Sequence, residues 1–227
     1  MKRILKIIAL GVLIGILMLV IQFTLQIPKD TFMFYYKIFG AVVILGAVLF
    51  NHFYIHAFQK KMKKAAIILE QGNAQEYIEL LESMRQYAKG RFLKHVIIVN
   101  LSAGYFRLQE YEKSIALLEG LAEQRLYGGL KMVYRLNLCA SYFYCGQTEK
   151  ALTLYEDSQK ILKPYRKSKL YGGNIMVLDI FAQLEQGALA LAEETLKTAK
   201  GAYSTPSLQE DYDFLDAKLQ QLQNKPS

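Results

Sequence analysis

The chain has 227 residues with 12% aromatic residues, no Trp and four Pro, which suits a helical protein of one domain or two small ones. Its net charge of +8 would be typical of a nucleic-acid-binding protein, but much of the excess is local. Residues 1–60 hold six Lys or Arg and one Asp, beside long apolar runs. Membrane orientation explains this placement better, so nucleic acid is excluded as a partner.

Residues 7–28 are predicted to form a transmembrane helix. They follow three basic residues, contain no charge and are long enough to cross a bilayer core, which needs about 20 residues. A secretory signal peptide begins in a similar way, but this stretch is long and no small-x-small cleavage site follows it. We therefore expect a retained anchor.

A second transmembrane helix is predicted over about 35–57, after a short polar turn. Aromatic residues gather at both ends of this span, as in interfacial belts. Four lysines follow, which should lie at the membrane surface and fix the topology: Lys60, Lys61, Lys63 and Lys64. The positive-inside rule then predicts a multi-pass protein of a bacterial-type inner or plasma membrane, with both termini in the cytoplasm.

Gly11 and Gly15 have the spacing that lets a second helix approach closely. Packing against the second span is the simplest use, and homo-oligomerisation is the alternative. Residues 1–59 are thus predicted to be a transmembrane hairpin. Because no Gly or Pro occurs between Gly46 and Gly72, the second helix should continue to about Glu70.

A repeated pattern organises residues 60–227. The segment 100–121, NLSAGYFRLQEYEKSIALLEGL, is echoed at 137–158, NLCASYFYCGQTEKALTLYEDS, and each copy predicts two amphipathic helices with a tight turn. The expected helices are 76–87 in an atypical first unit, 92–107 with 111–124, 130–144 with 148–161, and a weaker pair within 173–200. A last helix beginning at Pro206, with Thr205 as its N-cap, should cap the array.

The tetrapeptide Leu-Tyr-Gly-Gly stands before the third and fourth units, at 126–129 and 170–173. Glycines there should end one helix and free the chain to begin the next. A ligand-holding glycine loop is the alternative, but no Lys-Ser/Thr follows either copy.

The second copy of the repeat resembles the tetratricopeptide repeat family, through Leu138, Cys139, Tyr142, Gly146, Ala151 and Tyr155. The first copy has Leu101, Ser102, Tyr105, Ser114 and Leu118, with Gln109 where the family has its turn glycine. The resemblance implies an all-α fold, in which the hairpin is followed by a cytoplasmic α-solenoid of helix–turn–helix repeats over 60–227.

The resemblance also implies that a protein or peptide partner binds along the concave surface, lined by the first helix of each unit. The groove candidates are Asn100, Phe106, Arg107, Asn137, Phe143 and Tyr144. The family's clamp for a C-terminal carboxylate is incomplete here, since Val99, Ala103 and Ala140 stand where polar or basic groups are needed. An apolar or amphipathic segment is the expected ligand, and packing between repeats is the alternative role of these residues.

Motifs for catalysis are not found. The sequence has no nucleophile elbow, Walker loop or HExxH motif. His52 and His56 share a helix face and could bind a metal, but no carboxylate lies nearby in sequence to complete the site, so interfacial rings are the better interpretation. Cys139 and Cys145 fit neither a CxxC motif nor a zinc site.

We therefore expect no enzyme, no cofactor and no metal. The predicted function is a membrane-anchored scaffold or adaptor that binds a protein partner on the cytoplasmic face. The alternative is a peptide-sensing regulatory protein that acts on a membrane partner.

Overall fold

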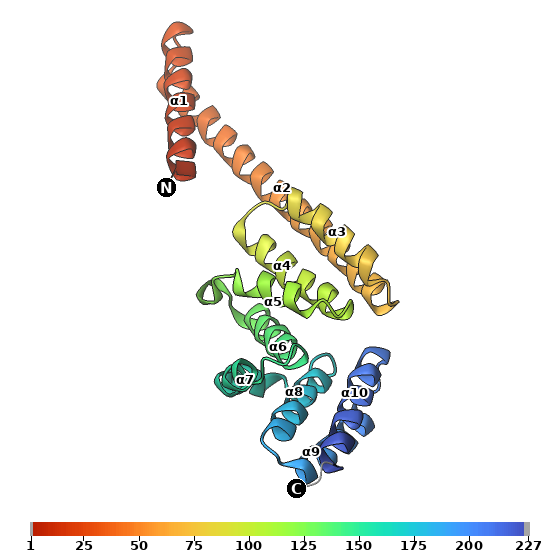
Figure 1. The fold of residues 1–227 in the computed structure, drawn as a ribbon. Helices are drawn as coiled ribbons and strands as arrows, with labels where there is room; N and C mark the ends of the chain where they lie inside the picture. Colours follow the sequence, from red (N-terminus) through yellow and green to blue (C-terminus); the bar gives the residue numbers. More distant parts are fainter. Residues whose placement is uncertain (1, 225–227) are drawn as a thin grey trace. The chain divides into compact units, whose positions relative to one another are not determined.

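The computed structural model describes residues 2–224, with side chains described for residue 9 and for residues 11–224. These residues form ten α-helices and two short 3-10 helices, and no strand occurs among them, which confirms the all-α prediction (Figure 1). Two compact units divide the chain, unit 1 at Met1–Met62 and unit 2 at Lys63–Ser227. The sequence predicted the boundary at residue 59.

Unit 1 contains α1 (Lys2–Thr24) and most of α2 (Lys29–Glu70). Helix α1 ends earlier than the expected residue 28, because Gln26 adopts a left-handed conformation with φ 50°. Its N–H and that of Ile27 turn back to the carbonyls of Phe23 and Gln22, which is how such a turn closes a helix. Helix α2 continues to Glu70, as predicted.

Among the described residues, α2 is the one helix long and apolar enough to cross a membrane, judged by length and composition. The apolar stretch of α1 that the structure describes, Gly11–Thr24, is shorter. The expected close packing at Gly11 and Gly15 is wrong for the contact between α1 and α2. A Cβ built on either glycine would have no described atom within 4 Å, so neither glycine is needed for that contact.

Unit 2 continues from the end of α2 through helices that pack in chain order. They are α3 (Ala74–Tyr87), α4 (Arg91–Arg107), α5 (Tyr111–Glu119), α6 (Gly128–Tyr144), α7 (Thr148–Leu162), α8 (Gly172–Glu185), α9 (Leu189–Ala202) and α10 (Pro206–Gln223), with 3-10 turns η1 (Glu123–Arg125) and η2 (Lys163–Tyr165). The pairs α4 with α5, α6 with α7, and α8 with α9 are helix–turn–helix units. Helix α5 stops at Glu119 rather than 124, because Gly120 and the η1 turn follow it.

One kind of turn recurs in unit 2, and a residue with positive φ marks each copy: Gly72 (84°), Gln109 (59°), Gly146 (73°) and Gly187 (75°). In every copy the N–H of this residue reaches the carbonyl three residues back, and the next N–H reaches five residues back. This is the Schellman motif. Gln109 therefore takes the place of a glycine, at the position where the sequence predicted that the turn residue had been replaced.

The helices of neighbouring units meet at small residues, and the small residues differ from one interface to the next. Ser114 lies five residues after Gln109, and Ser141 lies five residues before Gly146; their hydroxyl oxygens are 2.8 Å apart and fully buried. At the equivalent positions one unit earlier stand Tyr77 and Gly104. A Cβ on Gly104 would come within 2.8 Å of Tyr77 Cδ1, so this glycine makes room for the large ring.

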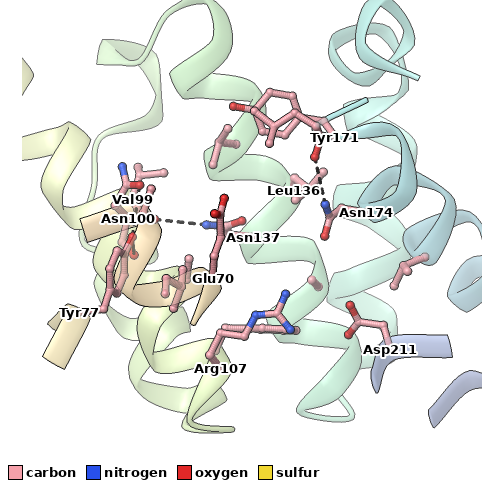
Figure 2. Close-up of a pocket in the computed structure, with 18 of the residues that line it drawn as sticks. Glu70, Tyr77, Val99, Asn100, Arg107, Leu136, Asn137, Tyr171, Asn174 and Asp211 are labelled. Atoms are coloured by element: carbon pink, nitrogen blue, oxygen red, sulfur yellow. Dashed lines mark hydrogen bonds between the residues drawn. The ribbon is translucent and has the colours of Figure 1, made fainter. Parts of the chain in front are cut away.

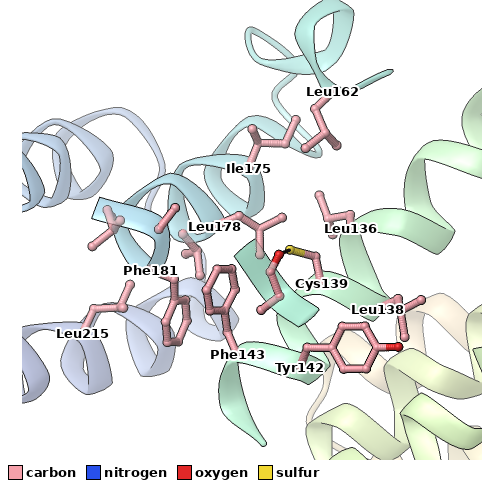
Figure 3. Close-up of a cluster of buried hydrophobic side chains, with 14 of the residues drawn as sticks. Leu136, Leu138, Cys139, Tyr142, Phe143, Leu162, Ile175, Leu178, Phe181 and Leu215 are labelled. Carbon is pink, nitrogen blue, oxygen red and sulfur yellow. Dashed lines mark hydrogen bonds between the residues drawn. The ribbon is translucent and has the colours of Figure 1, made fainter. Parts of the chain in front are cut away.

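The main core runs through unit 2 from α4 to α10, and Figure 3 shows the part of it around α6 and α8. Phe143 of α6 stacks on Phe181 of α8, with ring centroids 4.9 Å apart and planes 10° apart. Ala151 on α7 is fully buried, and its carbonyl accepts a bond from the Cys139 thiol at 3.4 Å. Helix α10 begins as predicted, with Pro206 in its first turn and the Thr205 hydroxyl accepting from the Leu208 N–H.

The two Tyr-Gly-Gly segments begin helices rather than only ending them, and they do so for different reasons. Gly128 starts α6 with φ 55°, a conformation that glycine adopts without strain. At Gly172 and Gly173 the reason is space. A Cβ there would come within 2.2 Å of the Tyr203 hydroxyl and 2.4 Å of Leu208 Cδ1, so α8 starts where the connection to α10 crosses it closely.

Candidate partner-binding groove

A groove of about 550 Å³ lies within unit 2, on the side formed by the first helix of each unit (Figure 2). Its walls come from the end of α2, from α3, α4, α6 and α8, and from α10. The apolar lining residues include Leu69, Val99, Ala103, Phe106, Leu130, Val133, Leu136, Ala140 and Val177. The volume is in the range of pockets that bury a small ligand or several side chains of a peptide.

Matching positions of α4 and α6 build the groove, because the two helices repeat with a spacing of 37 residues. Asn100 and Asn137 form one such pair, Ala103 and Ala140 the next, and Arg107 with Tyr144 the third, and all six residues line the cavity. The two alanines leave room between the helices. This repetition makes the groove continuous across two units.

The asparagines are held by the protein through their N–H groups. Asn137 donates from Nδ2 to the Val99 carbonyl at 3.2 Å and to the Ser102 hydroxyl at 3.1 Å. Asn100 donates to the Val96 carbonyl at 2.8 Å, and its own carbonyls accept from the Tyr77 hydroxyl. The amide oxygen of Asn137 has no hydrogen-bond partner among the described residues, so this position offers a ligand an acceptor rather than a donor.

One end of the groove is closed by polar contacts from α10. The Tyr144 hydroxyl donates to Asp211 Oδ1 at 2.5 Å. Burial, together with the Asp211 carboxylate, raises the pKa of Tyr144, and burial also raises the pKa of Asp211 against the opposing effects of Tyr144 and Arg107. Arg107 donates to the Ser207 carbonyl at 3.2 Å. At this end of the groove, a buried carboxyl group from the C-terminal helix thus lies against the neutral phenol of Tyr144 on α6.

Aromatic rings surround this closed end. Tyr144 is the centre of the cluster, with its ring centroid 5.1 Å from Phe106, 5.3 Å from Tyr111, 5.0 Å from Phe181 and 4.9 Å from Phe214. Contacts of this kind stabilise beyond the area they bury. They fix the Tyr144 ring, and hence the hydroxyl that binds Asp211.

The structure brings five of the six predicted groove residues to one cavity: Asn100, Phe106, Arg107, Asn137 and Tyr144. The placement of Phe143 in the groove is wrong, because its side chain is 4% exposed and stacks on Phe181 in the core. Neighbouring residues on a helix point about 100° apart, so Phe143 turns away from the groove that Tyr144 lines. Sequence reasoning did not find Asp211, Tyr171, Asn174 and Glu70, which also line it.

The other predicted sites are not among the residues that line the groove. Lys60, Lys61, Lys63 and Lys64 are exposed on α2, and His52 and His56 are also exposed there. No group of three His, Cys, Asp or Glu that could hold a metal ion is found in the part of the chain that the structure describes. Cys139 is buried, which raises the pKa of its thiol to about 12, and Cys145 is partly buried.

Comparison with models of known protein families finds no match for this chain, and comparison with curated proteins finds none either.

Proposed function

We propose that this protein is a membrane-anchored interaction scaffold whose unit 2 is a tetratricopeptide-type α-solenoid. In this proposal α1 and α2 form a transmembrane hairpin, both termini lie in the cytoplasm, and the groove binds a segment of a protein partner. The observation that carries the proposal is the apolar groove made from matching positions of α4 and α6. A repeated surface of this kind suits an extended or helical segment better than a compact small molecule.

The lining of the groove defines the chemistry of the partner. Apolar side chains form most of the walls, and the amide oxygen of Asn137 is an available acceptor. The charged lining groups are Glu70, Arg107 and Asp211, and the last two are already engaged by the protein itself. The fitting ligand is an apolar or amphipathic segment that presents an N–H donor near Asn137, not a free carboxylate.

The proposal is tested by filling the groove. Ala103→Trp with Ala140→Trp places two indoles in the cavity, because both alanines line it and are only partly buried. Crosslinking in cells, followed by mass spectrometry, identifies the partner captured by the native chain. Binding of that partner to the variant should weaken at least about 30-fold, the effect of losing one strong contact.

Ala190→Trp is the matched control, since Ala190 is exposed on α9 and does not line the groove. This variant should bind normally. If the groove variant keeps both its melting temperature and full partner binding, the binding surface lies elsewhere and the proposal fails.

A regulatory sensor is the second candidate function, and the contacts of α10 favour it. Two groove residues donate hydrogen bonds to α10. Arg107 donates to the Ser207 carbonyl, and the Tyr144 hydroxyl donates to the Asp211 carboxylate. A peptide that entered this end would have to displace those contacts, and so would loosen the C-terminal helix. Hydrogen exchange over 206–223, measured with and without the captured partner, distinguishes the candidates: faster exchange on binding supports the sensor, and unchanged or slower exchange supports the scaffold.

A further inference from the structure

The connections of unit 2 lie on two opposite edges, because successive helices alternate in direction. The tight turns within units lie on the turn edge, defined as residues 69–76, 106–113, 143–150 and 184–191. The links between units lie on the connection edge, defined as residues 87–95, 120–131 and 163–171. In Figure 1 the links before α4 and before α6 lie at the same end of their helices.

Two contacts show that the three links lie at the same level along the stacked helices. Asn137, nine residues into α6, bonds to the carbonyl of Val99, eight residues into α4, so these two helices start level. A Cβ on Gly129, at the start of α6, would lie 3.9 Å from the Tyr165 hydroxyl in the last link. The connection edge is therefore one continuous margin of unit 2.

The two edges carry opposite charge. The connection edge has nine Lys or Arg and one Glu, whereas the turn edge has three Lys or Arg and six Glu. On the connection edge Lys131 is paired with Glu123 and Arg166 with Asp179. Seven of the nine basic residues of this edge, whether paired or not, are exposed to solvent: Lys89, Arg91, Lys94, Arg125, Lys163, Lys167 and Lys169. This excess of positive charge along one edge attracts an anionic surface.

Exposed apolar side chains share the connection edge with these charges. Tyr127 is 76% exposed, Tyr87 75%, Leu170 68% and Phe92 64%, and no other large hydrophobic residue described in unit 2 exceeds 54%. All three links contribute at least one of them. Water-facing aromatics and leucine among basic residues are the composition of surfaces that enter the headgroup region of a bilayer.

We propose that the connection edge docks on the surface of a bilayer that contains anionic phospholipids. The inference rests on the membrane anchoring proposed above, and it adds a second, reversible contact. Basic and aromatic residues together are also found on surfaces that bind single-stranded nucleic acid. The aliphatic Leu170, which has no ring to stack on a base, and the long apolar helix α2 in the same chain favour the bilayer.

The test uses the full chain in vesicles, with one fluorophore on Cys introduced as Tyr127→Cys. Cys145→Ser removes the more accessible native thiol, and Cys139 stays because it is fully buried. Vesicles of phosphatidylcholine are compared with vesicles that also contain phosphatidylglycerol, each doped with a lipid-borne quencher. We expect strong quenching at position 127 in the anionic vesicles, and little quenching of the same label on Gln186→Cys, which is exposed on the turn edge.

Removing basic residues measures how strongly their charge favours docking. A basic residue near an anionic leaflet favours docking about fivefold. Lys167→Gln with Lys169→Gln should therefore lower the ratio of docked to undocked protein about 25-fold. Lys150→Gln with Lys197→Gln removes the same charge from exposed positions outside the connection edge and should change the ratio little.

Flotation separates failure of docking from failure of anchoring. Protein that floats with both kinds of vesicle but gives equal, weak quenching at 127 and 186 overturns the docking proposal and leaves the anchor intact. Protein that floats only with anionic vesicles and is quenched at 127 supports docking and overturns the anchor. Protein that floats with neither overturns both. A fluorescence change at 127 that single-stranded DNA produces and lipid does not would assign the edge to nucleic acid and overturn docking.

Discussion

At the scale of single residues, Gln109 shows how unit 2 tolerates a strained position. Its φ of 59° is the conformation that Gly72, Gly146 and Gly187 adopt in the other copies of the turn. A residue with a side chain pays a steric cost there of about 1–2 kcal/mol. The two backbone bonds of the turn, from Gln109 to Phe106 and from Glu110 to Tyr105, are nevertheless both formed, at 2.9 Å each.

Gln109→Gly should therefore stabilise unit 2 by about 1 kcal/mol, because glycine adopts this conformation freely. The measurement is urea unfolding of the full chain in detergent, followed by circular dichroism. Gln186→Gly is the control: this residue precedes the turn glycine of its unit and has φ −86°, so the change should give no gain. A loss of stability in Gln109→Gly would mean that the side chain makes a contact worth more than the strain.

The burial of Asp211 predicts that the stability of the folded chain depends on pH, and it also gives the direction of that dependence. Burial raises the pKa of Asp211 in the folded chain above the ordinary value of 3.8 for an aspartate. Below that value the carboxyl is protonated in both the folded and unfolded states; as the pH rises through the higher folded-state pKa, ionising the buried group costs stability. Asp211→Asn keeps an oxygen to accept from Tyr144 but does not titrate.

Compared with Asp211→Asn, the native chain should thus be relatively more stable in acid and relatively less stable at neutral pH. Hydrogen exchange of α6 and α10 in both chains, measured from acid to neutral pH, checks this. A stability difference that is independent of pH, or that grows in favour of the native chain toward neutral pH, would show that the folded-state pKa is not raised.

At the scale of helices, the interface between α3 and α4 depends on the large ring of Tyr77 packing against Gly104, which has no side chain. A Cβ on Gly104 would lie 2.7 Å from Ile78 Cγ1 and 2.8 Å from Tyr77 Cδ1, both near the base of their side chains. Tyr77 is further fixed by the bond from its hydroxyl to the Asn100 carbonyl at 3.0 Å. The neighbouring helix therefore has little freedom to move aside.

Gly104→Ala should destabilise unit 2, because overpacking costs about 1–3 kcal/mol while the better helix propensity of alanine returns about 1 kcal/mol. Adding Tyr77→Leu should recover part of the loss, which a double-mutant cycle measures by urea unfolding. Gly201→Ala is the matched control: Gly201 also lies in a helix, but no described atom is within 4 Å of its Cβ position, so this variant should gain stability. Equal gains in both single variants would contradict the packing described for Gly104.

The order and type of the helices could be predicted from the sequence because each turn leaves a local mark. Gly72, Gly146 and Gly187 stand at the turns, and the apolar stripes of the flanking helices repeat at matching offsets. Which side each stripe faces was harder to predict. Phe143 and Tyr144 are both large and aromatic, and the sequence does not show that Phe143 is the one that stacks on Phe181 in the core.

Long-range pairings left no such mark in the sequence. Asp211 lies 67 residues from Tyr144, on a helix whose Leu208, Tyr212 and Leu215 predicted only a cap. Its neighbours gave no reason to place a buried carboxyl in the groove. The early end of α5 at Glu119 was a local signal, since Gly120 follows directly, and it could have been predicted from propensity alone.

At the scale of the whole chain, topology is the prediction on which the proposed function depends. A reporter active only in the cytoplasm should be active when fused after Ser227, and a reporter active only outside should be active when inserted at Lys29. The reason is that Lys60, Lys61, Lys63 and Lys64 follow the apolar part of α2 and should stay on the inner side. Changing these four lysines to Gln should weaken the orientation, and the inverse reporter pattern in the native chain would place the groove outside the cell.

The pairs of residues between successive units also determine how the chain can change in evolution. Tyr77 requires Gly104, and Ser114 lies against Ser141, so each junction has its own steric match. A gene duplication that copied the unit of α4 and α5, or a deletion that removed it, would bring mismatched partners together. Deletion would set the Tyr77 ring against Ser141, which has a side chain where Gly104 has none. The number of units is therefore constrained by the fit between neighbours, and with it the length of the groove.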